Sequence, residues 1–78
     1  MVKIYVGAAF SPVEVIVDPS KTVNQVFKEA GVAIPAGSIV TWNTRRLGDN
    51  ELDTPLKTLG ELAEDDAIIF SQKLNGAK

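Results

Sequence analysis

The side chains most often used in catalysis are missing from this chain: none of its 78 residues is histidine or cysteine. A Ser-His-Asp triad, a Cys-His pair, a histidine general base and a zinc site of cysteine and histidine ligands are therefore impossible within one chain. Two acidic runs remain, Asp49-Asn50-Glu51 and Glu64-Asp65-Asp66. Their oxygens could bind a hard cation, but neither run has the spacing of a calcium loop. We interpret both as solvated turns and predict no enzymatic activity, no cofactor and no metal.

The net charge and the composition exclude further classes of protein. The formal charge is −2 with a pI near 4.9, and the basic residues are scattered apart from Arg45-Arg46. Because a nucleic-acid binder gathers basic residues on one face, we predict no nucleic acid as partner. No stretch is apolar enough to span a bilayer, and "MVKIYVGAAF" is too short for a signal peptide. The lack of cysteine fits a reducing compartment, so we expect a cytoplasmic protein that binds no membrane.

Two strands are predicted before residue 18, because apolar residues alternate there with other residues. The residues that share a face are Ile4 and Val6 in the first segment and Val13, Val15 and Val17 in the second. A short connection that contains glycine separates the two segments. We therefore expect an antiparallel hairpin, with Glu14 and Ile16 on its other face.

A helix is predicted from about residue 22, where the apolar period changes from two to about 3.6. One stripe collects apolar residues at i, i+3, i+4 and i+7, namely Val23, Val26, Phe27 and Ala30. Thr22 and Gln25 have the spacing of a capping box. Gly31 suits the C-terminal stop, although the helix could continue to Ala33. We expect the stripe to cover one face of the sheet.

Three further strands and a short helix follow. In "SIVTWNTRRLGDNE" we expect a strand, a turn near Asn43-Thr44 and a short strand, with these residues facing the core: Val40, Trp42 and Leu47. Leucines recur every three residues at Leu56, Leu59 and Leu62, which suits a short 3₁₀ or single-turn helix. The last strand carries Ile68 and Phe70 on one face. The order strand, strand, helix, strand, strand, short helix, strand predicts an α+β fold of two layers.

In this order the chain resembles the ubiquitin-like β-grasp family over nearly its whole length. "KIYV" resembles the family's first strand, "VEVIVDPSKTVNQV" its second strand and capped helix start, and "AIP" the Ile-Pro after the helix. "LGDNELDTPLKTLGEL" resembles the fourth strand and the short helix, and "EDDAIIFSQKLNGA" the last strand and the tail. The resemblance implies a mixed sheet of four to five strands packed on one α-helix, with a short 3₁₀ helix. It divides the chain into a single domain, residues 1–74, and a flexible tail, residues 75–78.

Members of this family act as noncovalent interaction modules or as covalent modifiers. The resemblance therefore implies a non-catalytic protein that works through protein–protein interaction, and we expect a monomer whose partners are other proteins. The alternative is a modifier or sulfur carrier that is activated at a C-terminal Gly-Gly, where this chain has Gly76-Ala77. Lys78 would first have to be trimmed. The partners would then include an adenylating enzyme and a processing protease.

The resemblance also bears on the binding surface. Partners of ubiquitin mostly grip an apolar patch on the sheet face away from the helix, and the matching positions here are small or polar: Ala8, Thr41 and Ser71. Three isoleucines on the outward registers of their strands are expected to form the interaction surface instead: Ile16, Ile39 and Ile69. Arg45 and Arg46, at a hairpin turn, are either a solvated charge pair or a contact for an acidic partner.

Overall fold

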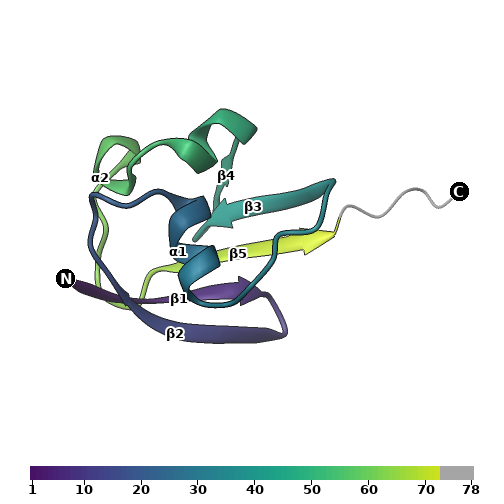
Figure 1. Ribbon diagram of the computed structural model, residues 1–78, viewed down its shortest axis with the longest axis horizontal. Coiled ribbons are helices and arrows are strands. Elements are labelled where there is room, and N and C mark those ends of the chain that lie inside the picture. Colours follow the sequence, from purple (N-terminus) through teal and green to yellow (C-terminus); the bar gives the residue numbers. More distant parts are fainter. Residues whose placement is uncertain (73–78) are drawn as a thin grey trace, which may run out of the picture.

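A five-stranded mixed sheet forms one layer of the molecule, and a helix packed on its face forms the second (Figure 1). The computed structural model describes residues 1–72. The strands are β1 (Val2–Ala8), β2 (Ser11–Val17), β3 (Ser38–Trp42), β4 (Arg45–Leu47) and β5 (Ala67–Gln72). The helices are α1 (Val23–Glu29), the 3₁₀ helix η1 (Asp49–Asp53) and the single turn α2 (Leu56–Leu59). The predicted α+β order is confirmed, with η1 added between β4 and α2.

The strands lie in the order β2-β1-β5-β3-β4. β1 and β5 run parallel in the middle of the sheet, while β1–β2, β3–β5 and β3–β4 are antiparallel pairs. Parallel neighbours cannot be joined by a tight turn, and the chain between β1 and β5 includes α1 and the other strands. β2 and β4 are consequently the two edges of the sheet.

The hydrophobic core lies between the sheet and α1. Its buried residues are Ile4, Val6, Val17, Val23, Val26, Phe27, Val40, Trp42, Leu47, Leu56 and Ile68. The rings of Phe27 in α1 and Phe70 in β5 meet with their centroids 6.4 Å apart. Trp42 is only 7% exposed, which confirms that it belongs to the core. The alternation of apolar residues therefore predicted the inner face of the sheet correctly.

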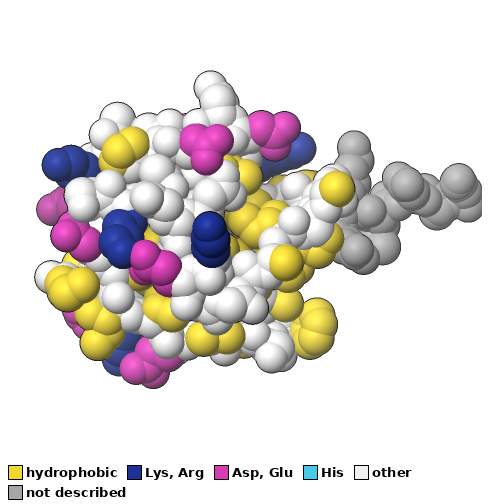
Figure 2. All heavy atoms as spheres, viewed as in Figure 1, with side chains coloured by type: hydrophobic (Ala, Val, Ile, Leu, Met, Phe, Trp, Pro, Cys, Tyr) yellow, Lys and Arg dark blue, Asp and Glu magenta, His cyan; other side chains and the backbone are white. Residues whose placement is uncertain are grey.

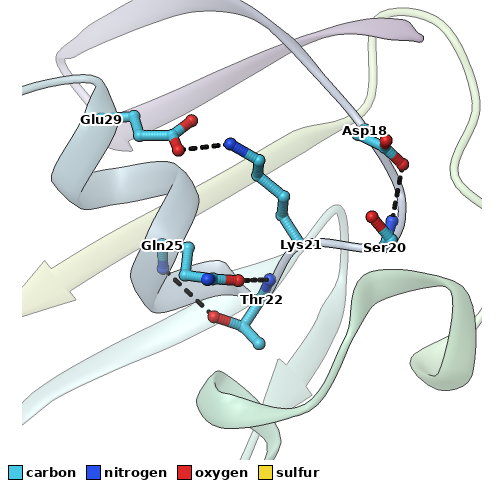
Figure 3. A network of polar contacts seen from close by, with 6 residues as sticks. All are labelled: Asp18, Ser20, Lys21, Thr22, Gln25 and Glu29. Atoms are coloured by element: carbon cyan, nitrogen blue, oxygen red, sulfur yellow. Dashed lines mark hydrogen bonds and ion pairs between the residues drawn. The ribbon is translucent and has the colours of Figure 1, made fainter.

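The start of α1 is closed by the capping box that the sequence predicts (Figure 3). Gln25 N donates to Thr22 Oγ1 at 3.2 Å, and Thr22 N donates to Gln25 Oε1 at 2.9 Å. In the preceding turn Ser20 N donates to Asp18 Oδ1 at 2.9 Å, and this hydrogen bond lowers the pKa of Asp18. Lys21 forms an ion pair with Glu29 on the exposed side of α1 (Figure 3).

The end of α1 is equally well defined. Gly31 has a φ of +76°, and its N–H donates to Lys28 O at 3.1 Å while Val32 N donates to Phe27 O at 2.9 Å. These two bonds are the Schellman pattern, which satisfies the last carbonyl groups of a helix. The helix therefore stops before Gly31 and does not continue to Ala33.

The turn of the β1–β2 hairpin differs from the expectation. Ala8 pairs with Ser11, so only Ala9 and Phe10 connect the two strands, and the connection contains no glycine. Gly7 lies inside β1 instead, with a φ of +123°. Side chains with a Cβ rarely adopt this conformation, so Gly7 is required by the path of the strand and not by the turn.

The two acidic runs are more structured than the sequence indicates. Asp49 opens η1, and Glu51 Oε1 accepts a hydrogen bond from Gly48 N at 2.7 Å. Asp66 accepts three hydrogen bonds, each 3.0 Å long, from Trp42 Nε1, Asn43 Nδ2 and Ala63 N. The prediction of a solvated turn is wrong for Asp66, because a partly buried carboxylate needs such donors. Within residues 1–72, no His, Cys, Asp and Glu side chains gather in a group that could hold a metal ion.

Candidate interaction surface

The outer sheet face is the one turned away from α1. Its residues alternate with the core residues along each strand, and the larger ones are Lys3, Tyr5, Glu14, Ile16, Ile39, Thr41, Arg46 and Ile69. Ile69 lies at the centre, because β5 is the middle strand and Ile69 pairs with Gly7 on one side and Thr41 on the other. Since Gly7 has no side chain, nothing from β1 covers Ile69 at that register.

The structure brings two of the three predicted isoleucines together. Ile39 pairs with Ser71, and Thr41 pairs with Ile69, so Ile39 and Ile69 are diagonal neighbours on the outer sheet face. Both side chains are half-buried. Ile16 lies apart on the edge strand β2, opposite Lys3, and is 65% exposed. The isoleucines therefore form a central pair and a separate edge residue.

The two arginines have different surroundings. Arg46 is exposed on β4 and pairs with Thr41, so it flanks the central isoleucine pair. Arg45 is engaged within the fold: its Nη1 donates to Leu59 O at 2.6 Å, and its Nη2 lies 2.9 Å from Glu51 Oε2. Arg46 is consequently the arginine that is available to a partner on the outer sheet face.

Exposed apolar side chains gather at the β2 edge of the sheet. The exposed large hydrophobic residues of the described chain are Met1, Phe10, Val13 and Ile16. Met1 precedes the β1 residue that pairs with the end of β2, Phe10 lies in the turn, and the other two belong to β2. Figure 2 shows apolar side chains along the lower border of the molecule, where Figure 1 places β2.

Sequence reasoning missed Phe10 and Val13 as surface residues. Val13 shares the inner register with Val15 and Val17, but it is 38% exposed because the inner face is not covered at the hairpin tip. The sequence pattern assigns Phe10 to neither face of the two predicted strands. A phenylalanine in such a position is a signal for surface exposure that the sequence does carry.

Charged side chains at the other end of β1 hold the fold together. Asp65 lies 3.3 Å from Lys3 Nζ, and the hydrogen bond and charge of Asp65 raise the pKa of Lys3. Burial acts to raise the pKa of Asp66, but the bonds from Ala63, Asn43 and Trp42 outweigh it and leave that pKa below its ordinary value. These carboxylates fix the turn before β5 against β1 and β3, so their role is structural.

Gly76 and Ala77, the predicted conjugation residues, lie outside the described residues, as does the boundary at residue 74 between domain and tail. In the described chain, no helix is long and apolar enough to cross a membrane.

Comparison with known proteins gives matches among solved structures alone. No protein-family model matches the chain, and no curated protein matches it. Ubiquitin from Caldiarchaeum subterraneum is 26% identical, with a TM-score of 0.60 over 97% of this chain and 98% of that chain. A ubiquitin-like protein from the same hyperthermophilic archaeon is 28% identical, with a TM-score of 0.52 over 95% of this chain and 99% of that one. The ubiquitin-like domain of an Arabidopsis thaliana protein is 20% identical and has a TM-score of 0.67 over 99% of this chain and 83% of its own, a likeness of fold.

Proposed function

Because this chain is a ubiquitin-like protein with the β-grasp fold, we propose that it works without catalysis, as an adaptor or module that binds other proteins. The observation that carries the proposal is the apolar β2 edge, where the exposed large hydrophobic residues of the described chain gather. Single apolar residues are normal on a protein surface, and it is their occurrence along one edge strand and at both its ends that supports a binding site there. An edge strand also offers unpaired backbone groups to a partner.

The proposed binding surface extends from the β2 edge to the centre of the outer sheet face. Ile16 is its exposed apolar anchor, and the central pair Ile39 and Ile69 supplies a second, half-buried contact. Arg46 lies at the far border, where it can pair with a carboxylate of the partner. Arg45 is left out of the surface, because its guanidinium is already bonded to Leu59 O and Glu51.

Ile16→Lys is the variant that tests this surface. The immobilised chain should retain specific proteins from its native source, and Ile16→Lys should lose them, because a charge replaces the most exposed isoleucine of the surface. Thr58→Lys, at an exposed position of α2, adds the same charge elsewhere and is the matched control. Circular dichroism of both variants should match the parent chain. Equal retention by both variants would refute the surface.

A second candidate function is covalent modification of other proteins, or sulfur transfer, through Gly76-Ala77 after removal of Lys78. The similarity to the ubiquitin of C. subterraneum, which covers nearly all of both chains, favours it. An adenylating enzyme and a processing protease would then be partners. Mass spectrometry of the native source should find the C-terminal peptide, ending at Gly76 or Ala77, on lysines of other proteins. Finding the chain only in its free form with Lys78 in place would count against conjugation.

A further inference from the structure

Phe10 is the most exposed large apolar residue of the described chain, at 92% exposure. It is the second residue of the two-residue turn between β1 and β2. Such turns favour glycine, asparagine and aspartate, so the turn itself gives no reason for an aromatic ring. Since Phe10 belongs neither to the core nor to the residue types that favour such a turn, we looked to a contact with another molecule as the reason for its ring.

An apolar hollow of about 380 Å³ lies beside this residue, lined by Ala8, Ala9, Phe10, Pro35, Phe70 and Ser71. Its walls come from the hairpin turn, the segment after α1 and the end of β5, which Figure 1 shows at one end of the molecule. A cavity of about 150 Å³ already accepts a benzene molecule, so this hollow is wide enough for an aromatic side chain.

The end of the molecule that carries Phe10 and the hollow is uncharged in the described chain. The hollow is lined from the segments 8–10, 35 and 70–71, and the stretches around them, 7–13, 31–39 and 69–72, contain no lysine, arginine, aspartate or glutamate. Depletion of charge together with an exposed aromatic residue is the composition found at the centre of protein interfaces. We call this surface, defined by the lining of the hollow, the Phe10 end.

We propose that the Phe10 end is a self-association surface and that its occupant is a second copy of this chain. In a two-fold contact, the Phe10 ring of each copy enters the hollow of the other, so the same surface supplies both the projection and the recess. A chain with a net charge of −2 is repelled by its copy, and an uncharged surface is where that repulsion opposes contact least.

The small area of this contact limits its strength. A buried aromatic side chain contributes about 150–250 Å², and two Phe10 rings with the rims of the hollows remain below the roughly 1,200 Å² at which stable interfaces begin. The dimer should therefore form at high protein concentration and dissociate on dilution, which is compatible with the monomer that the sequence leads us to expect.

Sedimentation equilibrium of the full chain, from about 10 μM to about 1 mM, measures this association. The weight-average mass should rise with concentration from that of the monomer toward that of the dimer. Phe10→Ser should raise the dissociation constant by more than about tenfold, because each copy loses the ring that fills the hollow. Ala63→Ser is the control, since it changes an exposed apolar side chain outside the hollow and outside the proposed binding surface, and it should follow the curve of the parent chain. Added salt should not weaken the association.

A second variant distinguishes insertion of the Phe10 ring into the hollow from nonspecific association of apolar surfaces. Ala9→Leu adds apolar atoms at the lining of the hollow, so it should weaken a contact that needs the hollow empty, whereas general attraction would become stronger. Ala9 and Phe10 are both exposed, so circular dichroism of Ala9→Leu and of Phe10→Ser should show the parent fold. A chain that stays monomeric at about 1 mM would overturn the proposal. So would an equal loss in Phe10→Ser and Ala63→Ser, or stronger association in Ala9→Leu.

Discussion

The two edges of the sheet are built in opposite ways. β4 has only three residues, and its Arg45 is held by Leu59 O and by Glu51 in η1. β2 has seven residues, most of them exposed, and it carries Val13 and Ile16 on the surface. A short edge secured by neighbouring segments resists pairing with other chains, whereas a long and apolar edge invites it.

The difference between the edges separates the part of the molecule that stabilises the fold from the part that is open to partners. On the β4 side, elements far apart in the chain are joined by side-chain hydrogen bonds: Asn24 in α1 donates to Asp53 in η1 at 2.6 Å, and Trp42 at the end of β3 donates to Asp66. The β2 side keeps Glu14 and Pro12 on its exposed edge strand, and a charge and a proline both oppose uncontrolled strand pairing. The β2 edge is therefore accessible to a partner, while Glu14 and Pro12 disfavour uncontrolled pairing with other strands.

The largest effect that separates the edges should come from shortening an apolar side chain on each. Leu47→Ala in β4 should lower the free energy of unfolding by about 2–5 kcal/mol, because Leu47 is buried in the core and its removal leaves a cavity. Ile16→Ala in β2 should lower it by less than about 1 kcal/mol, because Ile16 is 65% exposed. Urea denaturation followed by circular dichroism measures both values. Similar losses in the two variants would break the distinction between a closed edge and an open one.

A smaller effect should come from Asp66, which secures the turn on the closed side. Asp66→Asn should lower the free energy of unfolding at neutral pH by about 1–3 kcal/mol, because the charged acceptor of three hydrogen bonds is replaced. The pKa of Asp66 is lowered in the fold, so its contribution is present above the unfolded value of about 3.9 and is lost as the pH falls through the folded pKa.

The test for Asp66 is the pH dependence of that difference. Urea denaturation of the parent chain and of Asp66→Asn, from about pH 7 down to about pH 3, should show the two stabilities converging in acid. Glu61→Gln, an exposed change in the same neighbourhood, should alter the stability at neutral pH by less than about 0.5 kcal/mol. If the difference in free energy of unfolding between the parent chain and Asp66→Asn were as large in acid as at neutral pH, the charge of Asp66 would not be the cause of its stabilising effect.

The fold could be predicted from the sequence where the cause is local. Thr22 and Gln25 close the helix start, Gly31 ends it, and the alternation of apolar residues fixes the inner face of the sheet, since each of these signals acts within a few residues. The role of Asp66 could not be predicted, because its donors Trp42 and Asn43 come from a strand and a turn more than twenty residues away.

The candidate surface was predictable only in part for the same reason. Alternation identified Ile16, Ile39 and Ile69 as outward residues, but their separation into a central pair and an edge residue depends on the strand order β2-β1-β5-β3-β4, which no local pattern encodes. Val13 shows the converse case. Its register is that of a core residue, and only the extent of the covering layer determines that it is exposed.

The smallest expected effect concerns the two adjacent arginines of β4, of which Arg45 is bonded to Glu51 and Leu59 O and Arg46 lies exposed on the outer sheet face. Arg45→Met should lower the free energy of unfolding by about 0.5–1 kcal/mol, because an exposed ion pair with Glu51 and a bond to Leu59 O are lost while most of the apolar stem is kept. Arg46→Met should change it by less than about 0.5 kcal/mol, since Arg46 lies exposed on the outer sheet face. Thermal unfolding of both variants at low and high salt measures the difference, which should shrink as salt screens the Arg45–Glu51 pair. A larger loss in Arg46→Met would mean that the outer face, and not η1, secures β4.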